Sequence, residues 1–215
     1  MEHSLSVDVW SDVVCPFCYL GARQLAQALE GFEHAEDVVV HHHAFELDPH
    51  TRHVDNSSLI ELVAAKYGIT LDRSRELHEG LSAQAAAVGV TMDFDVAQPT
   101  NTFDAHRLIA LAAAQGQSEE MSQRLFRAYF AEGLLVSDHD QLNELAEEVG
   151  VLDASLLWET DAFASDVRAD EGAAEQLGIS GVPAFLIDSK FMVLGAQGAD
   201  KIAEVLERAW TRQSA

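Results

Sequence analysis

Strand-like segments occur only at the two ends of this chain, and a long stretch with helical patterning separates them. Residues 5–10 alternate apolar and polar side chains with β-branched enrichment, and residues 38–45 form a second such run. Strand character returns only at residues 184–187 and 191–194, which flank an Asp-Ser turn and predict a hairpin. Because strands need partners, we expect the two ends of the chain to meet in one sheet.

Helical patterning accounts for most of the remaining residues. Apolar positions with a period near 3.6 predict a helix over residues 16–30, ended by Gly31, and a last amphipathic helix that contains Ile202 and Trp210. Further helices are predicted at residues 57–67, 72–88, 101–115, 118–132, 138–149 and 163–177. Glycines suited to terminate them are Gly68, Gly89, Gly116, Gly150 and Gly178. Capping residues stand at Asn101, Thr102, Ser118, Ser137 and Asp138.

The order of these elements predicts the fold. Without residues 55–178 the order is βαβ followed by ββα, which is the arrangement of the thioredoxin fold. We therefore expect an α/β protein with a thioredoxin fold and a large all-helical domain inserted between its two halves. Residues 1–54 and 179–215 would form the thioredoxin-like domain, and residues 55–178 the inserted helical domain.

The two cysteines of the chain stand in Cys15-Pro16-Phe17-Cys18, at the predicted start of the first helix. Pro16 suits the first helical turn, where its missing N–H leaves no hydrogen bond unmade. The positive end of the helix dipole favours the thiolate of Cys15 over its thiol. Such a thiolate attacks a disulfide and forms a mixed disulfide, which a second thiol resolves. The spacing predicts a redox-active pair, with Cys15 as the exposed nucleophile and Cys18 as the shielded resolving thiol.

Two other uses of the cysteines fit the sequence less well. A zinc site needs further ligands at a matching spacing. The run His41-His42-His43 offers two at most, because His42 would point to the opposite face of a strand from its neighbours. A permanent disulfide would close a loop too short to stabilise a chain of this size. We therefore expect redox chemistry, with no metal and no bound cofactor.

Charge argues against two classes of partner. The chain carries 36 acidic and 13 basic residues, for a formal net charge of −23. Such a surface repels nucleic acid and anionic membranes, and no basic stripe interrupts it. No run of about 18 apolar residues predicts a membrane span, and Met1-Glu2-His3-Ser4 does not begin a secretory signal peptide. We expect a cytoplasmic protein with no nucleic-acid or membrane partner, and its oligomeric state stays open.

A second motif, Gly181-Val182-Pro183, directly precedes the third predicted strand. A proline at the start of a strand that must pair turns the chain there, and X-Pro bonds have ready access to the cis form. A cis Val182–Pro183 bond would present the backbone of Val182 to an extended substrate beside Cys15. The alternative is an ordinary trans loop proline. The dithiol before it and the hairpin after it favour cis.

These motifs resemble those of the DsbA-like thioredoxin-fold oxidoreductases. The resemblance rests on residues 10–18, Trp10-Ser11-Asp12-Val13-Val14-Cys15-Pro16-Phe17-Cys18, and on residues 181–185, Gly181-Val182-Pro183-Ala184-Phe185. The cytoplasmic FrnE-like branch, associated with polyketide biosynthesis clusters and stress-related thiol chemistry, is similar at residues 45–49, 101–108 and 195–197. The resemblance covers nearly the whole chain, including the helical insertion.

The resemblance implies a thiol–disulfide oxidoreductase or isomerase that acts on proteins or on small thiols such as glutathione. Cys15 and Cys18 match the active-site dithiol of the family, and Pro183 matches its cis-proline. Substrate contacts are expected at Val182, Pro16, Phe17, Trp10 and Asn101. Periplasmic members often carry His between the cysteines; Phe17 brings no positive charge, so we expect a less oxidising disulfide.

Other polar residues near the motifs are weaker candidates. A buried carboxylate near Cys18 would assist its deprotonation, and Asp8 is a candidate for this role, with a solvated strand residue as the alternative. Asn101, Thr102 and His106 begin a predicted helix that should roof the dithiol, where they could contact a thiol substrate, but helix capping by Asn101 or Thr102 is the simpler explanation. His41–His43 are expected to be strand residues of mixed burial.

Two other functional classes remain open. Glutathione-dependent isomerases and transferases, such as 2-hydroxychromene-2-carboxylate isomerase and kappa-class glutathione transferase, share this fold but usually lack the second cysteine. The presence of Cys18 therefore argues against them. A chaperone-like binding protein would use an apolar groove beside the dithiol, and no sequence feature independently supports it.

Overall fold

A four-stranded sheet in the order β2-β1-β3-β4 forms the centre of the protein. The structure is a computed structural model that describes residues 4–51 and 58–213. The strands are β1 (Leu5–Ser11), β2 (Val38–Ala44), β3 (Ala184–Ile187) and β4 (Phe191–Leu194). β1 runs parallel to β2 and antiparallel to β3, and β3 and β4 form an antiparallel hairpin. The two ends of the chain therefore meet in one sheet, as the pattern of strands predicts.

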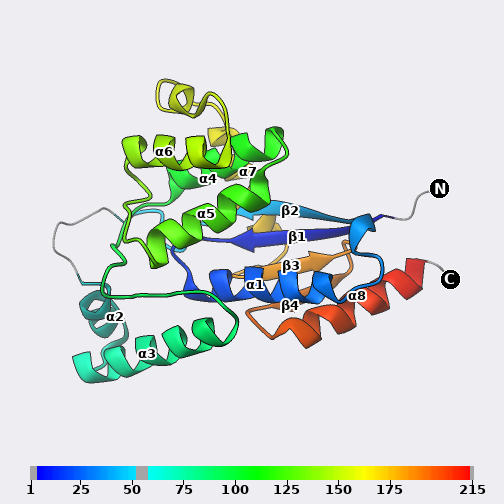
Figure 1. The fold of residues 1–215 in the computed structure, drawn as a ribbon, viewed down its shortest axis with the longest axis horizontal. Helices are drawn as coiled ribbons and strands as arrows, with labels where there is room; N and C mark the ends of the chain where they lie inside the picture. Colours follow the sequence, from blue (N-terminus) through cyan, green and yellow to red (C-terminus); the bar gives the residue numbers. More distant parts are fainter. Residues whose placement is uncertain (1–3, 52–57, 214–215) are drawn as a thin grey trace.

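Helices α1 (Pro16–Glu30) and α8 (Ala199–Gln213) cover one face of this sheet (Figure 1). Alternation along β1 explains why: Leu5, Val7 and Val9 share a face, and all three pack with both helices in one apolar cluster. Trp10 points to the other face and packs near Ala174. The βαβ–ββα order and the thioredoxin fold are thus confirmed.

The segment between β2 and β3 is helical, as predicted. Its α-helices are α2 (Leu59–Tyr67), α3 (Leu71–Ala87), α4 (Phe103–Ala114), α5 (Ser118–Phe130), α6 (His139–Val149) and α7 (Ala164–Gln176). Their ends differ from the predicted ones by at most two residues, and position 57, the expected start of the first, lies outside the described residues. Two 3₁₀ helices, Ala35–Asp37 and Ala154–Leu157, have no counterpart in the prediction.

Capping explains most of these helix ends. The predicted glycine terminators, from Gly68 to Gly178, all have positive φ angles. The Asp138 carboxylate accepts the N–H of Gln141 at 2.9 Å and caps α6. The prediction that Ser118 is a cap is wrong, because Ser118 is the first helical residue of α5 and Gln117 occupies the N-cap.

The largest apolar cluster joins the start of α1 to the helical insertion. Cys15, Cys18 and Tyr19 pack in it with Leu108 of α4 and Phe126 of α5, and the rings of Tyr19 and Phe126 stack with centroids 5.0 Å apart. In Figure 1, α4, α5 and α6 gather above the sheet, whereas α2 and α3 form a separate pair at the lower left. The thioredoxin half and the insertion therefore share a core, and the domain boundaries at residues 54/55 and 178/179 stay a prediction.

The two ends of the described chain lie together at one end of the sheet, on the right of Figure 1. There the side-chain amide of Gln213 donates to the backbone oxygen of Ser4 at 3.5 Å. Helix α1 begins at the opposite end of the sheet, where β1 ends. Within residues 4–51 and 58–213, no helix has both the length and the hydropathy needed to cross a bilayer.

Candidate active site

Cys15 occupies the N-cap of α1, with Pro16 as the first helical residue. Its backbone is extended, with φ −89° and ψ 115°, and its carbonyl accepts the N–H of Cys18 at 3.0 Å. The first turn of α1 carries no acidic side chain. Cys15 therefore stands at the electropositive end of the helix, and Cys18 lies one turn inside.

The loop before β3 closes over Cys15. The Cys15 thiol points to the carbonyl oxygen of Val182 with an Sγ–O distance of 3.7 Å, and the Val182–Pro183 peptide bond is cis. Cys15 retains only 4 % of its accessible surface. The expectation of an exposed Cys15 is therefore wrong, because the Val182 backbone and the apolar cluster of the insertion enclose it.

Gly21 is the residue of α1 that allows this approach, and no sequence argument singled it out. A Cβ atom on Gly21 would lie 2.8 Å from Cγ of Pro183 and 3.0 Å from Cζ of Phe185. Contacts this short are not tolerated between well-packed carbon atoms. The absence of a side chain at Gly21 thus lets α1 pack directly against the proline loop.

Cys18 is more deeply enclosed than Cys15, with 1 % of its surface exposed. The backbone N–H of Asp12 donates to Cys18 Sγ at 3.5 Å. Burial, the hydrogen bond with Cys15 and the charge of the Cys15 thiolate raise the pKa of the Cys18 thiol well above its ordinary value. Cys18 is therefore a shielded, protonated thiol at neutral pH, in agreement with the resolving role expected for it.

Asp12, and not Asp8, is the buried carboxylate beside Cys18. One carboxylate oxygen of Asp12 accepts the N–H of Leu47 at 2.7 Å, and the other lies 3.6 Å from Nε2 of His106. Asp8 instead meets His43 at 3.0 Å. The prediction for Asp8 is wrong because its side chain turns toward the neighbouring strand β2, whereas Asp12 follows the end of β1 and folds back under α1.

A histidine between two carboxylates joins the sheet to α7. His43 on β2 contacts Asp8 through Nε2 at 3.0 Å and Asp170 of α7 through Nδ1 at 2.7 Å. The second oxygen of Asp170 accepts the N–H of Ala44 at 2.9 Å. Although burial lowers it, the hydrogen bonds with Asp170 and Asp8 leave the pKa of His43 above its ordinary value. These contacts fasten α7 to the strand.

Trp10 belongs to the same junction and not to a substrate surface. It is buried, its ring stacks on that of His43 with centroids 4.5 Å apart, and its Nε1–H donates to the carbonyl oxygen of Asp170 at 3.1 Å. The prediction that Trp10 contacts substrate is therefore wrong, because α7 covers the face of β1 on which Trp10 lies.

The polar groups of Asn101 are already occupied. Its Oδ1 accepts the N–H of Phe103 at 2.9 Å, and its Nδ2 donates to Glu46 at 3.1 Å. Asn101 thus caps α4 and ties it to the loop after β2, which is the alternative that the sequence leaves open for it. Thr102 is buried and makes no side-chain cap.

Two predicted contact residues lie at the rim of the dithiol. Phe17 is 47 % exposed, and Pro16 is partly buried. Leu47, whose backbone N–H binds Asp12, is also exposed. Exposed apolar side chains near the buried sulfur atoms are therefore available to a substrate.

Two of the three histidines on β2, His42 and His43, bind carboxylates of the helical insertion. His41 is exposed, and Nε2 of His42 contacts Glu119 of α5 at 2.8 Å. In the part of the chain that the structure describes, no group of three or more His, Cys, Asp or Glu side chains is arranged to hold a metal ion.

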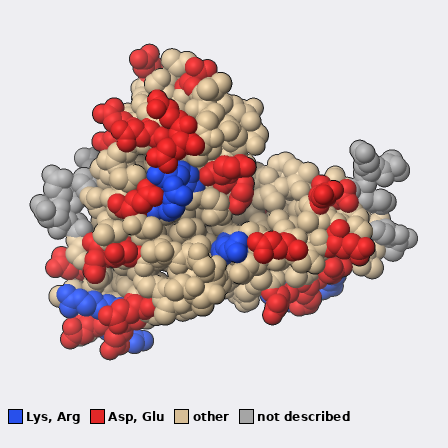
Figure 2. Space-filling model, viewed as in Figure 1, with Lys and Arg blue, Asp and Glu red and all other residues tan. Residues whose placement is uncertain are grey.

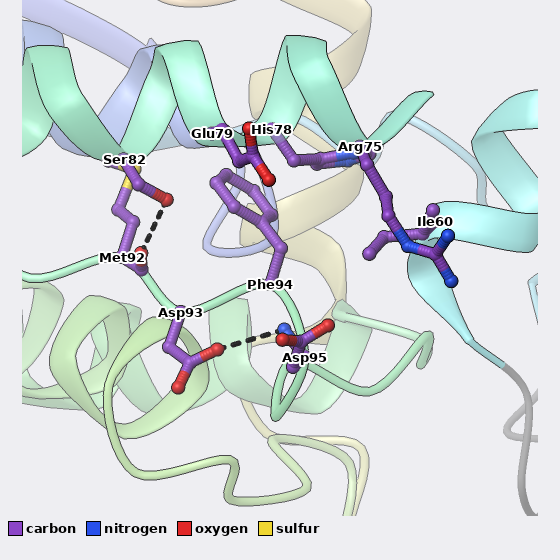
Figure 3. A pocket seen from close by; sticks show the side chains of 9 residues that line it. All are labelled: Ile60, Arg75, His78, Glu79, Ser82, Met92, Asp93, Phe94 and Asp95. Atoms are coloured by element: carbon purple, nitrogen blue, oxygen red, sulfur yellow. Dashed lines mark hydrogen bonds between the residues drawn. The ribbon is translucent and has the colours of Figure 1, made fainter. Parts of the chain in front are cut away.

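A cavity of about 440 Å³ lies away from the dithiol, between α3 and the segment 92–95. Figure 3 shows Glu79 of α3 beside the ring of Phe94, and Arg75 of α3 beside Ile60. None of the residues predicted to bind substrate lines this cavity.

Acidic side chains are spread over the face shown in Figure 2, and the Lys and Arg side chains visible there lie beside them. Arg124, for example, contacts Glu148 at 2.7 Å and Glu132 at 2.9 Å. No basic stripe runs across this face.

Comparison with known proteins agrees with this architecture. The family model described as a DSBA-like thioredoxin domain matches residues 6–207. The uncharacterized protein YwbO of Bacillus subtilis (strain 168) is 32 % identical over 203 residues, which cover 92 % of this chain and 93 % of that protein.

Solved structures of the same fold are also similar. The crystal structure of the probable DsbA oxidoreductase SCO1869 from Streptomyces coelicolor superposes with a TM-score of 0.91 at 36 % identity, covering 96 % of this chain and 90 % of that one. A 2-hydroxychromene-2-carboxylate isomerase superposes with a TM-score of 0.70 at 16 % identity, covering 97 % and 98 %. This second likeness concerns the fold alone.

Proposed function

The chain belongs to the family of DSBA-like thioredoxin domains, and from this premise we propose that it is a thiol–disulfide oxidoreductase or isomerase whose redox centre is Cys15 and Cys18. The observation that carries the proposal is the pairing of two different thiols. Cys15 caps a helix beside the Val182 carbonyl, and Cys18 lies behind it as a protonated thiol. A nucleophile and a resolving group need these different environments.

The reaction proceeds in two exchanges. The Cys15 thiolate attacks one sulfur of a substrate disulfide, forms a mixed disulfide and releases the other substrate sulfur as a thiolate. Cys18 then loses its proton and attacks Cys15 Sγ, which releases the second substrate thiolate and closes the Cys15–Cys18 disulfide. The substrate gains two electrons and, from solvent, two protons. Run backward, the same steps oxidise a dithiol.

Substrate is held at the loop before β3. Because the Cys15 thiol already faces the Val182 carbonyl, a substrate sulfur bound to Cys15 lies next to the backbone of Val182 and Pro183. Phe17 and Pro16 supply apolar contact at the rim. These contacts do not depend on substrate sequence, which suits protein disulfides and small disulfides such as that of glutathione.

We place the activity in the cytoplasm, where the prevailing reducing conditions favour reduction or isomerisation of substrate disulfides.

The test is a trapping experiment. Cys18→Ser should accumulate a mixed disulfide between Cys15 and a substrate such as insulin or oxidised glutathione, detected by mass spectrometry as a covalent adduct. Cys15→Ser should form no adduct and lose insulin reduction. Retained reductase activity in Cys15→Ser would refute the assignment.

The same pair of variants separates this function from a glutathione-dependent isomerase. That chemistry needs one activating residue, so full turnover of a chromene carboxylate with glutathione in Cys18→Ala would favour it. Loss of multiple-turnover activity in Cys18→Ala, with Cys15 still able to form an adduct, supports the dithiol mechanism.

A further inference from the structure

His106 on α4 is a buried histidine with an unused ring nitrogen. Its side chain is 2 % exposed, and Nε2 is enclosed without a hydrogen-bond partner. Oδ1 of Asp12 lies 3.6 Å from this nitrogen, slightly beyond hydrogen-bond distance. An enclosed polar atom without a partner destabilises the folded protein, so its presence calls for an explanation.

Asp12 connects this nitrogen to the dithiol. The backbone N–H of Asp12 donates to Cys18 Sγ at 3.5 Å. The negative charge of the Asp12 carboxylate is one of the causes, after burial and Cys15, that raise the pKa of Cys18. Oδ2 of Asp12 already accepts the N–H of Leu47. Oδ1 accepts the N–H of Val14 at the longer distance of 3.5 Å, and it is the oxygen that faces His106.

His106 also lines a small polar cavity. Its volume is about 20 Å³, and its polar lining consists of Ser11, His42, His43, His106 and Asp170. A cavity of this size with several polar partners accommodates one water molecule. Asp170 is 28 % exposed, and His42 contacts the half-exposed Glu119, so the cavity is bordered by groups that reach solvent.

We propose that His106 carries a proton between Asp12 and this cavity, and so acts as a positioning residue for the step in which Cys18 resolves the mixed disulfide. The inference rests on the proposed function of the dithiol. It assigns to the helical insertion a part in the chemistry of the thioredoxin half, since α4 belongs to the insertion and Cys18 to α1.

The step balances as follows. Cys18 gives its S–H proton to the Asp12 carboxylate, and the resulting thiolate attacks Cys15 Sγ. The bond between Cys15 and the substrate sulfur breaks, and the substrate sulfur leaves with the electron pair. Asp12 passes the proton to Nε2 of His106, and the other ring nitrogen releases a proton to water in the cavity. In the reverse direction the same groups return a proton to Cys18.

The groups around His106 agree with this route. Asp12, which contacts Cys18, faces Nε2 of His106, and His42, His43 and Asp170 line the cavity that His106 borders. The charge of Asp12 also acts on Tyr129. Burial and this charge raise the pKa of Tyr129 far above neutrality. The phenol therefore stays neutral and does not compete for the proton.

The experiment is stopped-flow reduction of 5,5′-dithiobis(2-nitrobenzoate), which reports the two exchanges separately. The first nitrothiobenzoate released marks attack by Cys15, and the second marks resolution by Cys18. His106→Gln keeps the shape and polarity of the side chain but does not relay a proton. We expect it to slow the second phase roughly 10- to 100-fold at pH 7, in line with general acid–base effects, and to leave the first phase unchanged.

The pH profile distinguishes proton transfer from a structural effect. In His106→Gln the second phase should rise steeply toward pH 9, as hydroxide replaces the relay, and Asp12→Asn should behave in the same way. The matched control is His41→Gln, an exposed histidine of β2, which should leave both phases unchanged.

A second phase in His106→Gln within twofold of the wild-type rate would overturn the inference. Equal slowing of both phases with an unchanged pH profile would also overturn it, since that is the signature of a packing role. A wild-type protein with no second phase would instead refute the proposed function.

Discussion

Gly21 lies so close to Pro183 that a methyl group on the glycine would sit 2.8 Å from the proline ring. The residue lies in the middle of α1, where glycine destabilises a helix by about 0.5–1 kcal/mol relative to alanine. Its presence there is explained by the loop that it contacts, because that loop carries the Val182 carbonyl beside Cys15.

Gly21→Ala should therefore destabilise the protein, despite the better helix propensity of alanine. We expect the free energy of unfolding in urea to fall by about 1–3 kcal/mol, since overpacking moves α1 or the proline loop. Gly80→Ala is the matched control: Gly80 lies inside α3, and its added Cβ would meet no atom within 4 Å. That variant should gain about 0.5–1 kcal/mol. Stabilisation by both substitutions would contradict the close packing.

The raised pKa of His43 predicts a pH-dependent contribution to stability. A histidine whose native pKa lies above the ordinary value of 6.5 favours folding in its protonated form. Its contribution is complete below about pH 6.5 and is lost as the pH rises through the native value. The difference in unfolding free energy between wild type and His43→Gln should therefore be largest in mild acid and narrow above neutrality.

Urea titrations from pH 5.5 to 8.5 measure this difference. His41→Gln, at an exposed position of the same strand, is the matched control and should cost little stability. If the difference in unfolding free energy between wild type and His43→Gln instead widened as the pH rose, the pairing of His43 with Asp8 and Asp170 would be ruled out.

Selective alkylation tests whether the thiols of Cys15 and Cys18 differ in reactivity. Since the pKa of Cys18 is raised and its side chain is enclosed, iodoacetamide at pH 8 should add once to the native reduced protein, at Cys15. Addition to Cys18 should require denaturant. Peptide mass spectrometry with a time course gives both rates, and comparable rates at the two cysteines in native protein would contradict the arrangement.

Arg168 should stabilise the protein through only one of its two carboxylate partners. It contacts Glu46 at 2.6 Å and Glu171 at 2.7 Å, but the Glu46 side chain is 1 % exposed and that of Glu171 is 24 % exposed. Arg168→Gln leaves the buried Glu46 carboxylate with the Asn101 amide alone and, because Arg168 is itself 54 % exposed, should cost about 1–2 kcal/mol. Glu171→Gln, which removes the exposed partner, should cost less than about 1 kcal/mol in the same urea titration.

Local patterns were sufficient to predict the secondary structure and the order βαβ–ββα. Alternation along β1, the 3.6-residue period of α1 and the glycines at helix ends act over a few residues, so a single sequence contains them. The dithiol at the start of α1 is predictable for the same reason. The two 3₁₀ helices are too short to leave a periodic pattern.

Contacts between distant segments were not predictable. His43 and Asp170 are 127 positions apart, and nothing in either segment indicates the other. Strand alternation predicts which face of β1 the Asp8 side chain takes but not which residue meets it there, so the contact with His43 could not be predicted. The burial of Cys15 and Trp10 has the same origin, since α7 and the proline loop arrive from the second half of the chain.

Because Ser4 and Gln213 are hydrogen-bonded neighbours at the end of the sheet remote from Cys15, the protein is well suited to circular permutation. A short peptide bridging these two positions, with new termini opened at a surface turn of the insertion such as Gly116, would make the six thioredoxin elements consecutive along the chain. The same geometry lets a reporter or a solid support be attached through either original end while the sulfur atoms remain directed away from it.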